Sequence, residues 1–176
     1  MRHLLGMLHP QGVRRQTLAL RAVLALYLLL ATAAPAWADT MSGVVFVVID
    51  GDTVLFKPDS YSAASRAFLK IRLANIDAPE KDQPYGEAAT RALSELVLDQ
   101  RVDVTTVATD FYGRTIAQIQ AGDVQVNTEL VRRGLALASR KAAMKKIQRD
   151  AQQAARGLWR EASPIPPWVW RREHAD

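Results

Sequence analysis

The stretch VVFVVIDGDTVLF, residues 44–56, decides the fold of this chain. β-branched and aromatic residues fill 44–49, and Asp50-Gly51, a dipeptide typical of tight hairpin turns, separates this run from a second apolar run that begins at Thr53. The pattern predicts two antiparallel strands joined by a short turn. Asp52, directly after the turn, places a carboxylate at the start of the second strand.

The period of the apolar residues predicts the elements that follow. Alternation of apolar and polar side chains indicates strands at 67–73, 101–107 and 115–121. Apolar stripes or short runs at helical spacing indicate helices at 85–98, 126–134 and 142–156. Three strands, a helix, two strands and then helices favour a mainly β protein. We expect a five-stranded barrel of the oligonucleotide/oligosaccharide-binding (OB) type with three helices.

The two ends of the chain differ from this domain, which we place at residues 39–160. PIPPWVWRR, residues 164–172, holds three prolines within four residues, so we expect neither a regular helix nor a central strand in the tail 161–176. Two interpretations of its tryptophans remain: Trp168 and Trp170 cover apolar surface of their own domain, or the strip docks against a partner.

Residues 1–38 have the pattern of a secretory signal. A basic region up to Arg21 precedes the apolar run AVLALYLLLATAA, residues 22–34, and the small-x-small sequence Ala36-Trp37-Ala38 follows. The run is shorter than the about 20 apolar residues of a membrane span. We therefore expect cleavage after Ala38, a secreted or periplasmic protein and no stable membrane association. An uncleaved signal anchor is the alternative.

Composition excludes several kinds of chemistry. The chain has no cysteine, and His174 is the only histidine after residue 38, so neither disulfides nor a zinc or copper site is expected. Four of the 23 basic residues lie in the first 38, which leaves 19 basic and 18 acidic residues in the remainder. This near-neutral charge predicts weak to moderate binding of nucleic acid.

Five charged residues lie at predicted strand ends or in the loops beside them: Asp52, Arg72, Asp77, Glu80 and Arg114. Carboxylates with backbone carbonyls suit calcium, a cation that prefers oxygen ligands. Guanidinium groups match the oxygens of a phosphate two at a time. Glu80 is a candidate to orient or deprotonate water. Taken singly, each residue is explained by a solvated strand end or a turn; the case for a site depends on their joint spacing.

Five motifs, taken in order, resemble the staphylococcal nuclease family over residues 43–160: IDGDT at 49–53, IRLANIDAPE at 71–80, DFYGR at 110–114, VNTELVRRGLA at 126–136 and GLW at 157–159. The resemblance implies a calcium-dependent phosphodiesterase. It assigns calcium ligation to Asp52, Asp77 and the Ala78 carbonyl, and phosphate binding to Arg72 and Arg114, with Arg114 also placed to assist the leaving group. Glu80 would be the catalytic acid that positions water.

The resemblance also implies two substrate contacts, and the chain departs from the family near both. Tyr112 would lie beside a terminal phosphate, but Phe111 stands where the best-known member has lysine. Arg140 aligns with a tyrosine that contacts the base. The loop KDQPYG, residues 81–86, is shorter than its counterpart. These departures concern preference for base and strand end rather than the metal and phosphate groups.

The expected partner is nucleic acid, both DNA and RNA, single-stranded or flexible, bound by a monomer with little sequence selection. Two other functions are consistent with the sequence. One is a non-catalytic module that only holds nucleic acid or protein, although such a module would be expected to have lost the arginines or the glutamate. The other is an exported structural or adhesion domain that calcium stabilises.

Overall fold

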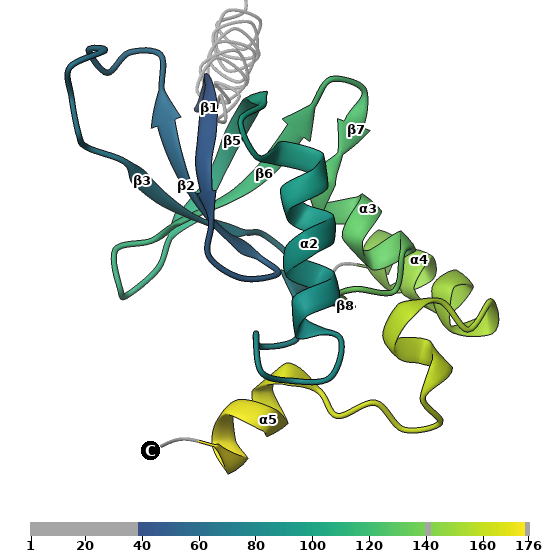
Figure 1. Ribbon diagram of the computed structural model, residues 1–176. Helices are drawn as coiled ribbons and strands as arrows, with labels where there is room; N and C mark the ends of the chain where they lie inside the picture. Colours follow the sequence, from purple (N-terminus) through teal and green to yellow (C-terminus); the bar gives the residue numbers. More distant parts are fainter. Residues whose placement is uncertain (1–38, 140–141, 175–176) are drawn as a thin grey trace, which may run out of the picture. The chain divides into compact units, whose positions relative to one another are not determined.

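A closed five-stranded barrel forms the centre of the protein (Figure 1). The computed structural model describes residues 39–139 and 142–174. The barrel strands are β1 (Thr40–Val48), β2 (Thr53–Pro58), β3 (Leu69–Leu73), β5 (Arg101–Thr109) and β6 (Thr115–Ala121). They follow the antiparallel order β3-β2-β1-β5-β6, and a parallel pairing of β3 with β6 closes the barrel. The predicted OB-type barrel is confirmed.

The first hairpin forms where the sequence predicts it. Val48 pairs with Val54 across the turn, and β1 begins at Thr40, earlier than predicted, because its first half pairs with β5. The pairing of Thr53 with Arg72 then joins β2 to β3. Asp52 therefore lies beside the end of β3 that carries Arg72, as a site at one barrel rim requires.

The core fills the barrel and continues under one helix. Fully buried apolar side chains from strands and helix meet there, among them Val45, Phe56, Ile71, Leu93 and Ile119. Burial of each such side chain stabilises the fold by about 1.5–3 kcal/mol. The helix is α2 (Gly86–Val97), whose buried residues recur at helical spacing as the sequence predicts.

The remaining elements pack beside the barrel, with α3 and α4 together (Figure 1). They are β4 (Ile76–Asp77), β7 (Val124–Gln125), α3 (Val126–Arg132), β8 (Leu137–Ala138), α4 (Ala142–Gln153) and the 3-10 helix η1 (Gly157–Arg160). Asn127 of α3, 3 % exposed, donates to the carbonyls of Ala74 and Ala117 at 3.0 and 3.1 Å and accepts from the Ile119 N–H at 3.0 Å. This side chain fixes α3 against the segment that leads into the site.

The three predicted helices are confirmed, but the expectation of an irregular tail is wrong. A further helix, α5 (Pro167–Glu173), forms in the tail. Pro167 stands in its first turn, where proline is tolerated because its missing N–H has no helical partner, and Pro166 precedes the helix in an extended conformation. Pro167 is buried, Trp170 is half-buried and Trp168 is 54 % exposed, so Trp168 is the more accessible of the two tryptophans.

Two predictions concern residues outside those described: the secretory signal at 1–38 and the role of Arg140. Within 39–139 and 142–174, no helix combines the length and the apolar character needed to cross a membrane.

Candidate active site

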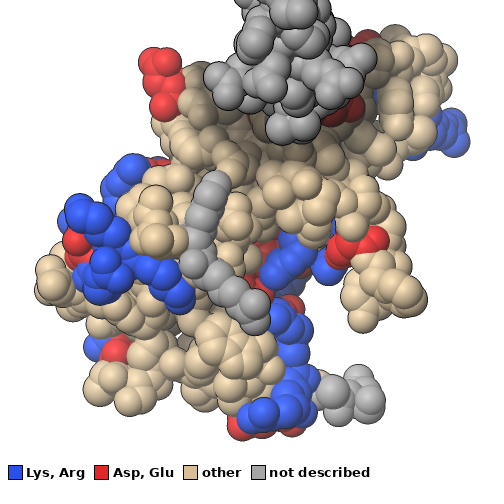
Figure 2. Space-filling model, turned by 180° about the vertical axis from the view of Figure 1, so that it is seen from behind, with Lys and Arg blue, Asp and Glu red and all other residues tan. Residues whose placement is uncertain are grey.

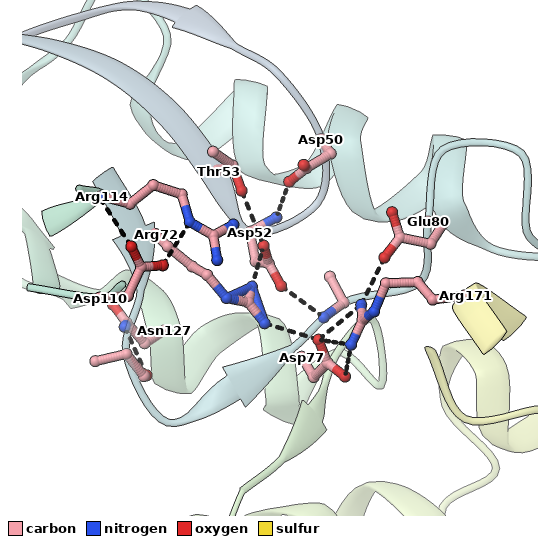
Figure 3. Close-up of polar contacts among 12 residues, drawn as sticks. Asp50, Asp52, Thr53, Arg72, Asp77, Glu80, Asp110, Arg114, Asn127 and Arg171 are labelled. Atoms are coloured by element: carbon pink, nitrogen blue, oxygen red, sulfur yellow. Dashed lines mark hydrogen bonds and ion pairs between the residues drawn. The ribbon is translucent and has the colours of Figure 1, made fainter. Parts of the chain in front are cut away.

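A hollow of about 350 Å³ opens at the barrel rim. Six of the predicted site residues line it: Asp52, Arg72, Ala78, Glu80, Tyr112 and Arg114. Arg171 of α5 lines it as well. Figure 2 shows a notch in the surface where basic and acidic side chains lie next to one another, and Figure 3 shows the contacts among them. The structure therefore brings together groups that are spread over most of the domain's sequence.

Asp52 is the most buried charged group of the site, 6 % exposed. Thr53 Oγ1 donates to its Oδ1 and the Ala78 N–H donates to its Oδ2, both at 3.0 Å. The Arg72 guanidinium lies 2.6 Å from Oδ1. Burial raises the pKa of Asp52 from 3.8 to about 6, against the opposing effect of Arg72. The buried negative charge is thus only partly compensated by the protein.

Gly51 allows the hairpin and the loop after β4 to approach this closely. It does not adopt a left-handed conformation, so a tight-turn requirement does not explain it. A Cβ atom at this position would lie 2.7 Å from Cβ of Ala78 and 2.7 Å from Cβ of Ala89. Packing of Ala78 and α2 against the hairpin therefore requires a glycine, a reason that the sequence pattern did not reveal.

Arg72 joins the two carboxylates predicted to bind calcium. Its Nη1 lies 2.6 Å from Oδ1 of Asp52 and its Nη2 lies 2.8 Å from Oδ1 of Asp77. Asp77 ends β4, which pairs with β8 through Asp77 and Leu137. One guanidinium therefore joins both acids (Figure 3), although Asp77 itself is not among the residues that line the hollow.

Arg171 is a site residue that the sequence interpretation missed. Its Nη1 lies 2.5 Å from Oε1 of Glu80, and its Nη2 lies 3.1 Å from Oδ2 of Asp77. Partial burial acts to lower the pKa of Arg171, but its hydrogen bonds to the two carboxylates outweigh that effect and raise it. No local signal marked Arg171, because its contact with Asp77 and Glu80 depends on helix α5, which the prolines of the tail made unexpected.

Asp110 is the second residue that was missed. Its Oδ2 accepts from Arg114 Nε at 2.7 Å, while its Oδ1 accepts from the backbone N–H groups of Tyr112 and Arg114 at 3.0 and 2.9 Å. Desolvation acts to raise the pKa of Asp110, but these bonds outweigh desolvation and hold the pKa below its usual range. Aspartate at the start of a turn, four residues before an arginine, was the available signal.

The comparisons with known proteins agree with the motifs. The model of the family described as "Staphylococcal nuclease homologue" matches residues 70–161. The chain belongs to the staphylococcal nuclease family. It is 39 % identical over 142 residues to an "Uncharacterized endonuclease" of Escherichia coli, covering 78 % of this chain and 89 % of the relative. It is 36 % identical over 169 residues to a "Micrococcal nuclease" of Shigella flexneri, covering 88 % and 92 %.

Membership of the staphylococcal nuclease family makes the chain a nuclease, a hydrolase of phosphodiester bonds. Its Asp52 and Asp77 offer the hard oxygen donors that suit calcium, and the partly compensated charge of Asp52 favours a cation nearby. Among the described residues, no group of three or more His, Cys, Asp or Glu side chains gathers as a metal cluster. The donor chemistry fits calcium, with backbone carbonyl and water oxygens needed to complete the shell.

Proposed function

We propose that this staphylococcal nuclease homologue is a calcium-dependent phosphodiesterase that hydrolyses DNA and RNA with little sequence specificity. One observation carries the proposal: Arg72, Arg114 and Glu80 line the same hollow as the buried carboxylate of Asp52. Phosphodiester hydrolysis uses groups of these kinds: guanidiniums that bind the phosphate, a carboxylate that is not a metal ligand, and a cation position rich in oxygen donors.

The cation position consists of Asp52, Asp77 and the carbonyl of Ala78. When bound there, calcium would add positive charge that stabilises the phosphoryl oxygens as water attacks. Asp52 is held for this role by Thr53 and the Ala78 N–H, so its orientation does not depend on Arg72 alone. Arg72 lies beside the same carboxylates, where its guanidinium would bind a phosphate once the cation takes over these acids.

Arg114 binds the scissile phosphate from the turn that leads into β6, the strand that pairs with β3. Its Nε donates to Asp110, and this contact leaves the terminal nitrogens of the guanidinium for phosphate oxygens. The Arg114 guanidinium carbon lies 5.6 Å from the centre of the Tyr112 ring. Tyr112 is 82 % exposed, which suits a contact with the terminal phosphate of a bound strand. The same placement would let Arg114 assist the leaving group.

Glu80 orients or deprotonates the attacking water. Its side chain is 32 % exposed and lines the hollow, within reach of water that enters from solvent. A non-catalytic module has less support, since it would have no need to retain Glu80, Arg72 and Arg114 in one hollow. We further propose that the domain acts as an exported monomer on single-stranded or flexible substrates, and that Arg140 contributes to their binding.

Cleavage of single-stranded DNA and RNA, with calcium and with chelator, tests the proposal. Glu80→Gln and Arg114→Ala should each lower the rate by about 10²–10³. Glu87→Gln and Arg91→Ala, exposed positions of α2, are matched controls that should retain wild-type cleavage. The proposal is wrong if the wild type cleaves neither polymer, or if chelator and both site substitutions leave cleavage unchanged.

A further inference from the structure

Arg171 holds the two carboxylates of the motif IRLANIDAPE, Asp77 and Glu80. Its guanidinium makes four hydrogen bonds to them: three to the oxygens of Asp77 at 3.1 to 3.3 Å and one to Oε1 of Glu80 at 2.5 Å. Arg171 lies 94 positions from Asp77 and 91 positions from Glu80 in the chain. Such a fork of charge-assisted bonds is strong and directional.

The tail is fixed in place just before α5, so this contact does not depend on Arg171 alone. Gln83 is 6 % exposed, and its Nε2 donates to the carbonyl of Ile165 at 2.7 Å. Its Oε1 accepts from the N–H of Glu80 at 3.1 Å. Pro167, at the start of α5, is buried. One buried amide thus connects the Glu80 backbone to the segment that delivers Arg171.

The bonds of Arg171 occupy the oxygens that a cation would need. Oδ2 of Asp77 accepts from Arg171, while Oδ1 accepts from both Arg171 and Arg72. A divalent ion and a guanidinium cannot occupy the same lone pairs, and their positive charges repel each other at this distance. Cation binding at Asp77 therefore competes with the Arg171 guanidinium, which donates three of the four hydrogen bonds that Asp77 accepts from the two arginines.

We propose that Arg171 is a tethered cation that sets the affinity of the site for calcium: it occupies the carboxylates of Asp77 and Glu80, and calcium would displace its guanidinium and loosen α5 beyond the anchored Pro167. The inference rests on the proposed function only in taking Asp77 as a ligand of the ion. Displacement also frees Glu80 from its pair with Arg171, so the group that positions water becomes available when the metal binds.

The exposure of the two ion pairs of Arg171 determines how much they lower the affinity for calcium. Arg171 has a side chain that is 45 % exposed, so each of its two ion pairs is screened by solvent. Exposed pairs contribute less than buried ones, and two of them acting against the metal correspond to about a tenfold change in its dissociation constant. The competition is intramolecular and is present at every protein concentration.

Isothermal titration calorimetry with calcium alone, without nucleic acid, tests the inference. Arg171→Gln should bind calcium about tenfold more tightly than the wild type. Arg172→Gln is the matched control: Arg172 is exposed on the same helix, and its side chain makes no hydrogen bond or ion pair with another described residue. Arg171→Lys keeps the charge but loses the fork and should give an intermediate affinity.

Hydrogen exchange of the α5 backbone gives an independent readout. Calcium should speed exchange at residues 168–173 in the wild type and in Arg172→Gln. In Arg171→Gln the helix should already exchange rapidly, and calcium should change it little. A wild-type helix whose protection is unaffected by saturating calcium would show that the metal and Arg171 do not compete.

The outcomes separate this inference from the proposed function. Equal or weaker calcium binding by Arg171→Gln overturns the inference, even if the wild type cleaves nucleic acid with calcium. Tighter binding by Arg171→Gln with no cleavage by any variant supports the inference and contradicts the nuclease proposal. Absence of calcium binding in all variants overturns both the inference and the calcium requirement.

Discussion

The backbone N–H of Ala78 donates a hydrogen bond of 3.0 Å to Oδ2 of Asp52, across 26 positions of the chain. This bond connects the turn of the first hairpin to the loop that carries Glu80. It also satisfies one oxygen of a carboxylate that burial makes costly to ionise. The hairpin and the loop therefore form one unit, and contacts that maintain the unit should affect both activity and stability.

Asp110→Asn should lower the cleavage rate without unfolding the protein. The substitution removes the negative partner of Arg114 Nε, 2.7 Å away, and leaves a guanidinium that is no longer held toward the hollow. Small misplacements of a phosphate-binding group cost up to about a hundredfold in rate, so we expect a loss of roughly tenfold to a hundredfold. Steady-state cleavage of single-stranded DNA measures this loss of rate.

The control for Asp110→Asn is Asp103→Asn on β5, where the carboxylate accepts a hydrogen bond from Ser42 outside the hollow. It should leave the rate unchanged. An Asp110→Asn enzyme with wild-type cleavage would show that Asp110 does not position Arg114.

Gly86→Ala should lower both stability and activity. A Cβ atom at Gly86 would lie 1.7 Å from the carbonyl oxygen of Glu80, so the backbone that carries Glu80 or the start of α2 must move. Overpacking of this kind costs about 1–3 kcal/mol, and we expect the upper part of that range because the contact is to backbone. Urea unfolding measures the loss of stability, and the cleavage assay measures the displacement of Glu80.

Glu87→Ala, at the next and exposed position of the same helix, is the control for Gly86→Ala. It should change the free energy of unfolding by much less. Wild-type stability and wild-type cleavage in Gly86→Ala would contradict the close approach of Gly86 to Glu80.

Glu129→Gln should destabilise the protein at neutral pH and have little effect in acid. Desolvation raises the pKa of Glu129, but hydrogen bonds from Arg133 and the charge of Arg132 outweigh it and hold the pKa below 4.5. A lowered folded-state pKa contributes stability that is present above the unfolded pKa and is lost as the pH falls through the folded pKa. The variant should therefore lose about 1 kcal/mol near neutral pH.

Urea unfolding of wild type and Glu129→Gln at about pH 7 and about pH 3 tests this prediction, since the second value lies below the ordinary glutamate pKa. The difference in free energy of unfolding should shrink in acid. An equal difference at both pH values would mean that the side chain stabilises α3 without its charge. Glu87→Gln, exposed and outside any ion pair among the described residues, should show no difference at either pH.

Much of the fold could be predicted because its signals are local. The hairpin at Asp50-Gly51 and the stripe of α2 follow from residues that are neighbours in the chain. Helix α5 was mispredicted for the same reason. Proline lowers helix propensity on average, whereas Pro167 stands at the one kind of helical position that tolerates it.

Most residues of the candidate site were named from the sequence, but their contacts were not. The sequence indicated Asp52, Arg72, Asp77, Glu80 and Arg114 as a set and could not show that Arg72 bridges the two aspartates. Asp110 and Arg171 were missed, since each acts through a partner whose position depends on the fold. Gly51 was attributed to turn chemistry, although packing against Ala78 and Ala89 requires it.

The sequence by itself determined the order of the five barrel strands and of the first three helices, the family and the chemical types of the groups at the strand ends. Those features depend on periodicity and on motifs, which are properties of short segments. Tertiary structure alone decided that β3 pairs with β6 to close the barrel and that Arg171 meets Asp77 and Glu80. These contacts join residues far apart in the chain, and their energies come from packing and charge in three dimensions rather than from local conformational preference.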